Sequence, residues 1–356
     1  MRVMHLVPAL FGEEGIFGGA ERYARELARS MAERLPTRLV SFGPTPKRFR
    51  DGPLQVVVLG PARYVRGQPA NPIHAGLIRE IARADVIHCH QQHIVASSLT
   101  AALGRASGRK VFVSDLGGGG WDISAYTSTD HWFHGHLHIS DYSRTSAGHD
   151  GNPNAKVIFG GVDTEWFSPG DGASHDGPVV FVGRLLPHKG VNDLIDAAPP
   201  DMPVEIIGRP YHAEFLAELH RRAAGKCVVF RHDASDGAIR DAYRRARCVV
   251  LPSVYRNLFG GETRVPELLG QTLLEGMACG APAICTNVAS MPEVVEHGVT
   301  GLITPPNDPP ALRERLIWLR DHPIEAAAMG RAGRRRVLAR FTWPAVVDRC
   351  LAAYKA

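Results

Sequence analysis

Short apolar runs alternate along the chain with longer segments of helical periodicity. The first pair is an apolar run at residues 3–7 and a segment at 20–34, where Tyr23, Leu27 and Met31 recur on one face. Apolar runs bounded by glycine, proline or polar residues are typical of strands that are buried on both faces of a parallel sheet. The alternation therefore predicts an α/β fold in which helices cover parallel sheets.

The expected elements fall into two series on either side of a break in composition. The first series of expected strands comprises residues 3–7, 38–42, 55–59, 85–88, 111–114, 138–140 and 156–159. The second series comprises residues 179–182, 204–207, 227–230, 249–251, 283–285 and 301–303. Between the two series, residues 168–178 are rich in serine, glycine, proline and aspartate, a composition typical of interdomain linkers. Residues 44–53 are expected to form a polar loop.

The break predicts two Rossmann-like domains, an N-terminal one at residues 1–166 and a C-terminal one at 167–340. A last helix at residues 341–356 follows the second domain. A chain of 356 residues exceeds the usual size of a single hydrophobic core, which agrees with two domains. A cleft between two such domains is the default place for a ligand.

Charge and composition narrow the class of protein. A formal charge of +5 suits an anionic ligand or a loose attraction to an acidic membrane surface. Basic residues alternate with acidic ones, and no aromatic-basic reading motif is present, so nucleic acid is not expected as a partner. No apolar run approaches the length of a membrane helix, and residues 1–8 are too short an apolar run for a signal peptide.

The cysteines indicate a reducing compartment. The six cysteines include no CxxC pair, and in a chain of this length they do not form a disulfide framework. Cys248, Cys279 and Cys285 have apolar neighbours and are expected to be buried thiols. The sequence thus predicts a cytoplasmic protein, and peripheral contact with the inner face of the membrane is the alternative that its charge allows.

Residues 252–282 carry the densest candidate chemistry. They follow the expected strand at 249–251, and apolar residues at helical spacing predict a helix that begins at Pro266. Glu267 and Glu275 would lie roughly two turns apart on that helix. A helix with so little other charge is mostly buried, and buried carboxylates need partners, which favours a functional role for this pair over a solvated face.

Two further stretches favour an anionic ligand. Arg184 and Lys189 follow the expected strand at 179–182, where a guanidinium fork and an ammonium group suit a diphosphate. A glycine-rich loop at residues 11–19 separates the first strand from its helix, an arrangement that favours phosphate binding because free helix N–H groups face the loop. Two surface cations and a tight turn are the alternative interpretations.

Histidines gather in two places that raise the question of a metal ion. They are His88, His90 and His93 in one place, and His131, His134, His136 and His138 in the other. The second set alternates as on a strand, so zinc is an alternative, although histidines also cluster in many proteins that bind no metal ion there. No Asp-x-Asp motif occurs, which argues against a magnesium ion bridging a diphosphate. We expect neither a metal site nor any other cofactor.

Taken together, the motifs resemble the retaining glycosyltransferases of family four, whose GT-B fold has two Rossmann-like domains facing across a cleft. The resemblance implies that the C-terminal helix at residues 341–356 packs back on the N-terminal domain. The resemblance extends over nearly the whole chain, and the order and spacing of its short motifs make it specific. The matching motifs are Gly18-Gly19-Ala20-Glu21, Asp85-Val86-Ile87-His88, Gly161-Val162-Asp163-Thr164, Gly183-Arg184, Lys189-Gly190, Pro252-Ser253, the Glu-x7-Glu pair Glu267 and Glu275, Pro292-Glu293-Val294-Val295 and Gly298-Val299-Thr300-Gly301.

The resemblance implies a hexosyltransferase that needs no metal and retains the anomeric configuration of its donor. The donor would be a nucleotide-diphosphate sugar, with a UDP-sugar as the leading expectation. The sugar would pass to a hydroxyl of a small molecule, a glycan or a lipid-linked acceptor, in the synthesis of cell-envelope glycans, glycolipids or glycosylated metabolites. Neither the acceptor nor an oligomeric state follows from the sequence.

The resemblance also implies roles for individual residues. Arg184 and Lys189 would hold the donor diphosphate, Glu267 would contact the sugar at the reacting centre, and Glu275 would bind the ribose. The first three form the expected catalytic set. The other expected donor contacts are Gly18, Gly19, Arg231, His232, Gly270, Gln271 and Thr272, and the expected acceptor contacts are Glu21, His90 and Asp115.

The chain departs from the family pattern at three places. Gly160-Gly161-Val162-Asp163 stands where Asn-Gly-Val-Asp is usual, and the loop between Ser253 and Glu267, which would shape the donor or acceptor pocket, is longer than the common form. The third departure concerns the donor sugar. Members often have Thr-x-His-Gly where this chain has Ser114-Asp115-Leu116-Gly117, so leucine replaces the histidine that usually meets the donor sugar. Two alternatives accompany the transferase, and the leucine motivates the second of them. One is a GT-B nucleotide-sugar epimerase or hydrolase, and the other is a non-catalytic paralogue that binds nucleotide sugars.

Overall fold

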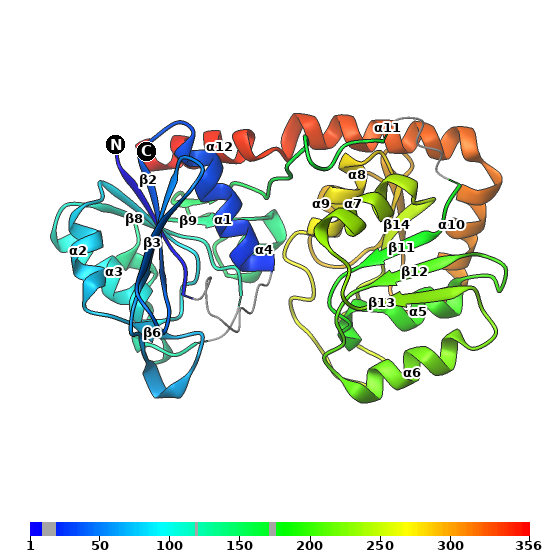
Figure 1. Cartoon of the computed structure of the whole chain (residues 1–356), viewed down its shortest axis with the longest axis horizontal. Helices are drawn as coiled ribbons and strands as arrows, with labels where there is room; N and C mark the ends of the chain where they lie inside the picture. Colours follow the sequence, from blue (N-terminus) through cyan, green and yellow to red (C-terminus); the bar gives the residue numbers. More distant parts are fainter. Residues whose placement is uncertain (9–18, 118–119, 171–175) are drawn as a thin grey trace. The chain divides into compact units, whose positions relative to one another are not determined.

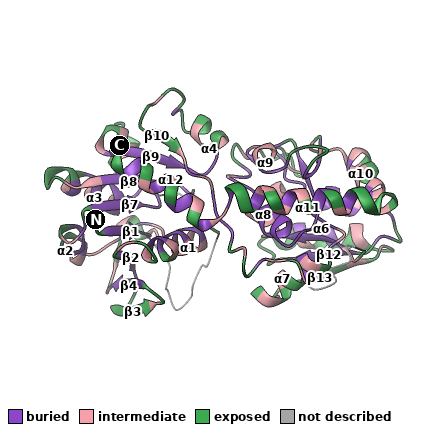
Figure 2. Ribbon diagram, turned by 90° about the horizontal axis from the view of Figure 1, so that it is seen from above, coloured by how far each residue is buried: buried purple, intermediate pink, exposed green. Residues whose placement is uncertain are grey.

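The computed structural model describes residues 1–8, 19–117, 120–170 and 176–356 (Figure 1). The chain divides into two compact units. The first unit comprises Met1–Gly161 together with Trp343–Ala356, and the second comprises Val162–Thr342. Each unit is built on one main sheet whose strands are largely buried, with helices beside it whose outer faces are exposed (Figure 2).

The first unit contains an eight-stranded sheet in the order β10-β9-β8-β7-β1-β2-β4-β3. All neighbouring strands are parallel except β3, which runs antiparallel to β4. The strands are β1 (Val3–Leu6), β2 (Thr37–Phe42), β3 (Lys47–Asp51), β4 (Leu54–Leu59), β7 (Val86–Cys89), β8 (Lys110–Val113), β9 (Gly135–His138) and β10 (Ala155–Val157). A small hairpin of β5 (Arg63–Tyr64) and β6 (Pro72–Ile73) stands beside this sheet.

The second unit contains a six-stranded sheet in the order β13-β12-β11-β14-β15-β16, parallel throughout. The strands are β11 (Val179–Val182), β12 (Val204–Ile207), β13 (Val228–Arg231), β14 (Cys248–Leu251), β15 (Ala283–Thr286) and β16 (Gly301–Thr304). The winding reverses between β11 and β14, because β12 and β13 lie on one side of β11 and the later strands lie on the other. In open α/β sheets, ligands bind outside the carboxyl ends of the strands at such a reversal.

The helices follow the strands in alternation. Those of the first unit are α1 (Gly19–Ala32), α2 (Gly76–Ala82), α3 (Val95–Ala106), α4 (Asp141–Ser146) and α12 (Trp343–Lys355), with 3₁₀ turns η1 (Val65–Gly67), η2 (Ile123–Ala125) and η3 (Asp130–Trp132). Those of the second unit are α5 (Val191–Ala197), α6 (Ala213–Ala223), α7 (Asp236–Arg245), α8 (Gln271–Ala278), α9 (Met291–Val294), α10 (Pro309–Asp321) and α11 (Pro323–Arg340), with η4 (Pro187–Lys189). The prediction of two Rossmann-like α/β domains is confirmed.

The last helix, α12, belongs to the first unit although it is the last element of the chain. Its Trp343 ring meets the edge of Tyr23 on α1, and its Asp348 pairs with Arg34. The hydroxyl of Tyr354 lies 2.8 Å from Nδ1 of His88 on β7. The chain therefore returns to its first sheet at its end.

Three predicted elements are corrected. Residues 44–53 contain strand β3, whose exposed and mainly charged residues gave no apolar period, as suits an edge strand. Strand β9 ends at His138, before the predicted segment 138–140 is complete, because Ser140 caps α4. Helix α8 begins at Gln271 and not at Pro266, because Gly270 before it has left-handed backbone angles.

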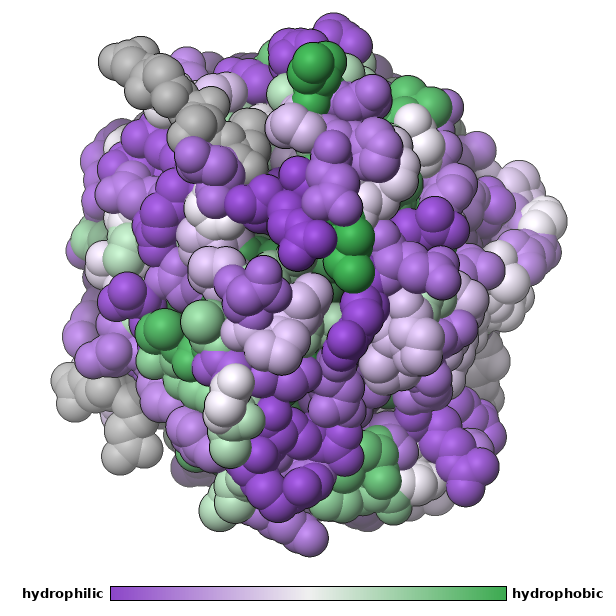
Figure 3. All heavy atoms as spheres, turned by 90° about the vertical axis from the view of Figure 1, so that its right-hand side faces the viewer, coloured by the Kyte–Doolittle hydropathy of each residue, from purple (hydrophilic) through white to green (hydrophobic). Residues whose placement is uncertain are grey.

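No helix within the described residues is long and apolar enough to cross a membrane. On the face drawn in Figure 3, hydrophilic side chains cover most of the surface and apolar side chains form small separate groups. Scattered apolar groups of this kind are usual on globular domains and need no partner to explain them.

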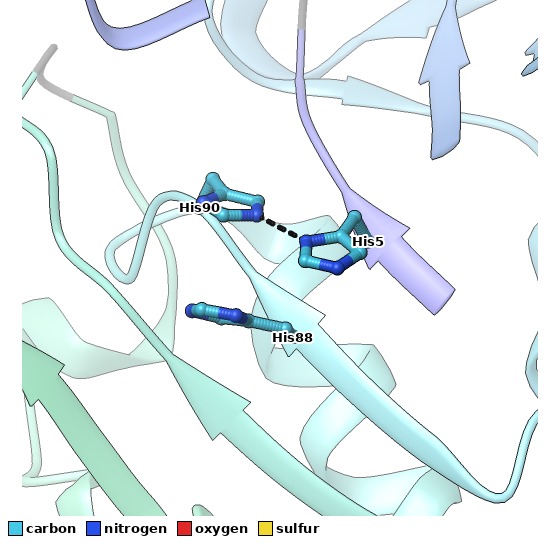
Figure 4. Close-up of side chains that lie close together, drawn as sticks. All are labelled: His5, His88 and His90. Atoms are coloured by element: carbon cyan, nitrogen blue, oxygen red, sulfur yellow. Dashed lines mark hydrogen bonds between the residues drawn. The ribbon is translucent and has the colours of Figure 1, made fainter. Parts of the chain in front are cut away.

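Three histidines lie together in the interior of the first unit: His5 on β1, His88 on β7 and His90 just after β7 (Figure 4). Nδ1 of His5 is 2.8 Å from Nε2 of His90, and Nε2 of His88 is 2.9 Å from the Ser114 hydroxyl. The rings of His88 and His90 are stacked, with centroids 4.4 Å apart. The three imidazoles thus connect neighbouring strands and, through His88 and Tyr354, helix α12.

Burial keeps these histidines neutral. It lowers the pKa of His5 to about 3, and it lowers the pKa of His88 and His90 well below the usual value, to which the neighbouring imidazoles add. The unfolded chain binds protons on these histidines near pH 6.5 and the folded chain does not. Their contribution to stability is therefore fully present above pH 6.5 and is lost as the pH falls below it.

One glycine determines how the loops after β11 and β14 meet. Gly190 has φ +65°, and a Cβ there would stand 1.9 Å from the carbonyl oxygen of Pro252. The amide of Val254 donates to the carbonyl of His188 over 2.8 Å, which joins the same two loops. Since only glycine permits so close a backbone approach, Gly190 holds the two loops in contact.

Acidification should unfold the first unit through its buried histidines. Between pH 7 and pH 5, protonation of the unfolded chain should cost about 2 kcal/mol of unfolding free energy for a histidine shifted as far as His5. His5→Phe keeps the ring stacked on His90 and removes one titrating group, so its stability should depend less steeply on pH. Urea unfolding of the wild type and of His5→Phe at pH 7 and pH 5 measures this dependence. An equal loss of unfolding free energy in the two proteins would contradict the prediction.

Gly190→Ala should lower the melting temperature far more than a matched change at Gly225. Gly225 also has a positive φ, +77°, but its Cβ position is open, so Gly225→Ala should cost only the left-handed strain of about 1–2 kcal/mol. Gly190→Ala should add the cost of a backbone clash, about 1–3 kcal/mol or more. Thermal unfolding of both variants makes the comparison, and equal shifts would show that the Pro252 contact is unimportant.

Candidate functional site

The candidate site of the second unit lies where the winding of its sheet reverses. Arg184 and Lys189 stand on the loop after β11, and Ser253 and Glu267 stand on the loop after β14. Because both strands are parallel and adjacent, their carboxyl ends lie at the same edge of the sheet. The fold therefore brings together four side chains separated by up to 83 positions in the sequence.

Lys189, Ser253 and Glu267 are in direct contact. Nζ of Lys189 lies 2.5 Å from Oε1 of Glu267, and the Ser253 hydroxyl donates to the same oxygen over 2.7 Å. The two charged side chains are only 13% and 10% exposed. A charge pair with so little solvent is held in one geometry, and removal of either partner leaves the other charge without compensation.

Glu267 does not share a helix with Glu275, contrary to the prediction. Gly270, with φ +83°, ends the loop that carries Glu267, and α8 begins one residue later. Glu275 lies inside α8 and is buried, and its Oε2 accepts a hydrogen bond from the Tyr243 hydroxyl over 3.1 Å. The two carboxylates therefore have different surroundings, one beside a lysine and one beside a phenol.

Helix α8 starts at the same sheet edge. Gly270 precedes it without a side-chain cap, and Gln271 and Thr272 in its first turn are half-buried. Gly276 faces β14 so closely that a Cβ would stand 2.4 Å from Cγ2 of Val249. The helix is thus fixed against the sheet with its N-terminus, the end of a helix that favours negative charge, at this edge.

Arg184 is exposed on the loop after β11. Its guanidinium lies 6.0 Å from the ring centroid of Tyr211, and no carboxylate among the described residues forms an ion pair with it. Between it and Lys189 stands His188, whose pKa is lowered to about 4 by burial and by the charge of Lys189. The loop therefore presents two cations around a neutral imidazole at pH 7.

Arg231 and His232 lie at the end of β13, at the outer edge of the sheet. Nε of Arg231 is 2.5 Å from Oε1 of Glu205, and Arg245 reaches the other oxygen of the same carboxylate over 2.5 Å. Nδ1 of His232 lies 2.8 Å from the carbonyl oxygen of Gly208. The side chain of Arg231 is thus engaged within the protein.

The donor and acceptor residues that were expected in the first unit lie on different elements. Gly18 lies outside the described residues, while Gly19 is the first residue of α1 and Glu21 lies in its first turn. His90 is buried in the histidine group of Figure 4, and Asp115 is exposed after β8. These residues follow β1, β7 and β8, which are neighbouring strands of the first sheet.

Sequence reasoning missed several contacts and residues of these sites. It included Ser253 in a motif but did not predict its hydrogen bond to Glu267, because a loop of 13 residues lies between them. Tyr243 and Tyr211 come from α7 and from the loop after β12, and His5 comes from a strand whose other residues are typical of the core. Nothing in the local pattern marks these residues, because their partners lie far along the chain.

Comparisons with known proteins match both units to glycosyltransferases. The family model described as glycosyl transferases group 1 matches residues 165–336, and the model described as a glycosyl transferase 4-like domain matches residues 18–147. D-rhamnosyltransferase WbpZ of Pseudomonas aeruginosa is 34% identical over 165 residues, 46% of this chain and 41% of the relative. A GDP-mannose-dependent phosphatidylinositol monomannoside mannosyltransferase of Corynebacterium glutamicum is 31% identical over 232 residues, 60% of this chain and 59% of the relative. The chain thus spans about half the length of the curated relatives it matches.

Solved structures agree on the fold. The Anabaena protein Alr3699/HepE, solved in complex with UDP, superposes with a TM-score of 0.74 at 19% identity, over 100% of both chains. A sucrose-phosphate synthase from Thermosynechococcus elongatus superposes with a TM-score of 0.73 at 19% identity, over 100% of this chain and 98% of its own. At such identities the likeness speaks for the fold alone. Together with the two family models, which cover most of the described chain, it confirms the resemblance drawn from the sequence: the chain belongs to the group 1 glycosyltransferases and has the GT-B fold.

Proposed function

We propose that this protein transfers a sugar from a UDP-sugar to an acceptor hydroxyl, with retention of the anomeric configuration and without a metal ion. The observation that carries the proposal is the contact of Lys189 with Glu267, beside Arg184, where the winding of the second sheet reverses. In open α/β sheets this is the usual position of a nucleotide or similar ligand. Family membership makes a sugar nucleotide the matching ligand class.

The two cations are suited to the charge that develops when the nucleotide leaves. Departure of the nucleotide places negative charge on the β-phosphate, and preorganised cations stabilise that charge most strongly in the transition state. Arg184 is exposed and presents a planar fork, and Lys189 is a point charge positioned by Glu267. Donor binding would give Lys189 a second anionic partner beside the carboxylate.

The carboxylates have separate tasks in this proposal. Glu267, fixed by Lys189 and Ser253, orients the sugar and does not attack it. Glu275, fixed by Tyr243, binds the ribose, and main-chain groups near Arg231 and His232 flank the base. The acceptor hydroxyl attacks from the face that the nucleotide leaves, and the leaving phosphate takes its proton, so the protein need not supply a strong base.

The identity of the nucleotide and the class of acceptor are also proposals. Solved neighbours carry UDP, UDP-glucose, or UDP with glucose, whereas one curated relative is described as GDP-mannose-dependent. We propose UDP, with Glu21, His90 and Asp115 on the acceptor side. A lipid-linked acceptor would suit the net charge of +5, which attracts the chain to an acidic surface. Hydrolysis of UDP-glucose, UDP-galactose and GDP-mannose compared side by side tests the nucleotide, and preference for GDP-mannose would overturn it.

Loss of either cation should slow transfer. Arg184→Ala and Lys189→Ala should each lower kcat at least about a hundredfold, the usual effect of removing one such donor. Arg331→Ala removes an exposed cation from α11 and is the matched control, with turnover like that of the wild type. Melting curves come first, because Lys189→Ala also leaves the Glu267 carboxylate without its cation. Near wild-type turnover in both folded variants would exclude the diphosphate role.

The two glutamates should separate in binding and turnover. Interactions that are equal in the ground and transition states affect binding, and those made only in the transition state affect kcat. Glu275→Ala should therefore weaken calorimetric binding of free UDP, while Glu267→Ala should leave it nearly unchanged and lower kcat at saturating donor. Glu325→Ala, an exposed change on α11, should alter neither quantity. The reverse pattern would show that the assignment of the glutamates is wrong.

Transfer should not depend on an added metal. With no Asp-x-Asp in the sequence, the cations that meet the diphosphate are protein side chains. Protein treated with EDTA and shown by its melting curve to be folded at the assay temperature should therefore keep its kcat. A loss of turnover that Mg²⁺ or Mn²⁺ restores would contradict a metal-independent mechanism.

A further inference from the structure

A second polar group in the first unit has features that the transferase reaction does not use. Asp130 on η3, His136 on β9 and His149 after α4 each offer one ligand atom, and these atoms lie within 4.8 Å of one another. Nε2 of His149 is 3.8 Å from Oδ2 of Asp130. His136 and His149 are 3% and 7% exposed.

These spacings fit a shared metal ion. Zinc bonds to imidazole nitrogen and carboxylate oxygen measure about 2.0–2.2 Å, so two ligands on one ion stand up to about 4.2 Å apart. The 3.8 Å separation of Asp130 and His149 lies within that limit, and small side-chain movements bring in His136. Two imidazoles and one carboxylate form a zinc ligand set that leaves a further coordination position for water.

The supporting hydrogen bonds are those that metal ligands require. Nε2 of Gln92 donates to Oδ1 of Asp130 over 2.6 Å, which leaves Oδ2 directed towards His149. Nδ1 of His149 lies 2.9 Å from Nε2 of His138, which fixes the ring and leaves its Nε2 for the ion. Such partners orient ligands and are a regular part of metal centres.

A cavity of about 520 Å³ opens beside the group. Asp130 and His136 form part of its wall, with Ser128, Asn152 and Asn154 among the other lining residues. The site therefore has a polar route for an ion and room for a water molecule as a fourth ligand.

The histidines of Figure 4 are a weaker candidate. Both nitrogens of His88 have hydrogen-bond partners, and His5 and His90 are bonded to one another. No carboxylate belongs to that group within the described residues. Its rings are stacked, an arrangement typical of packed neutral imidazoles.

We propose that Asp130, His136 and His149 bind one divalent transition-metal ion of the zinc type, with His138 and Gln92 as supporting residues. The ion joins η3, β9 and the segment after α4 at the edge of the first sheet, and so stabilises that edge. None of these five residues is among those proposed above to contact the donor or the acceptor. The ion is therefore structural and is not needed for turnover.

Calorimetric titration with Zn²⁺ of the 356-residue chain, after EDTA has removed any bound metal, tests the proposal. One equivalent should bind, and the melting temperature should rise as it does. Asp130→Asn and His149→Gln should each weaken binding at least about a hundredfold, and Co²⁺ in the wild type should give the visible absorption of a four-coordinate ion. His131→Ala removes an exposed histidine that lines the same cavity and should bind Zn²⁺ like the wild type.

A milder variant keeps the test decisive if a ligand substitution fails to fold. Gln92→Met removes only the hydrogen bond to Asp130 and should weaken Zn²⁺ about 10–100-fold, the usual effect of losing such a partner. The proposal would be overturned if Zn²⁺ did not bind stoichiometrically, or if Asp130→Asn bound it with unchanged affinity. It would also be overturned if folded His90→Gln no longer bound one equivalent of Zn²⁺.

Discussion

The candidate site depends on the close approach of two loops at the point where the second sheet reverses its winding. Gly190 has no room for a side chain against Pro252, and its left-handed backbone turns the chain from η4 into α5. This approach places Lys189 against Glu267 and Ser253, far apart in the sequence. The ion pair is therefore a consequence of backbone packing, and its low exposure makes it rigid enough to position a ligand.

Much of the architecture was predictable because buried strands carry a strong signal. Apolar runs such as Val179–Val182, which is followed by Gly183, and Cys248–Leu251, which is followed by Pro252, are typical of buried parallel strands. The exposed edge strand Lys47–Asp51 was missed for the same reason, since a charged strand at the rim of a sheet has no apolar period. Periodicity reports burial, and only through burial does it report secondary structure.

The surroundings of the predicted site residues were less predictable than the fold. A resemblance of short motifs identified Glu267 and Glu275, but periodicity placed both on one helix, because the apolar residues before Gly270 continue the spacing of α8. Because Gly270 has a positive φ, α8 begins after it, and Glu267 lies on a loop and not on the helix. The bonds from Tyr243 to Glu275 and from Gln92 to Asp130 join residues 32 and 38 positions apart, and no local pattern predicts such pairs.

Histidines have two different uses in the first unit. His5, His88 and His90 bond to one another and to Ser114 and Tyr354, which satisfies most of their polar atoms internally. His136 and His149 instead face a carboxylate beside a cavity, where a ligand can complete their contacts. The same side chain thus serves packing in one place and suits coordination in the other, and the difference lies in the neighbouring groups.

A crystal structure of the protein with UDP tests the central claim most directly. The account predicts diphosphate oxygens within hydrogen-bonding distance of both Arg184 and Lys189, next to the first turn of α8, with the ribose against Glu275. A diphosphate bound instead to Arg231 and Arg245 at the outer edge of the sheet, with the Lys189–Glu267 pair untouched by ligand, would contradict it.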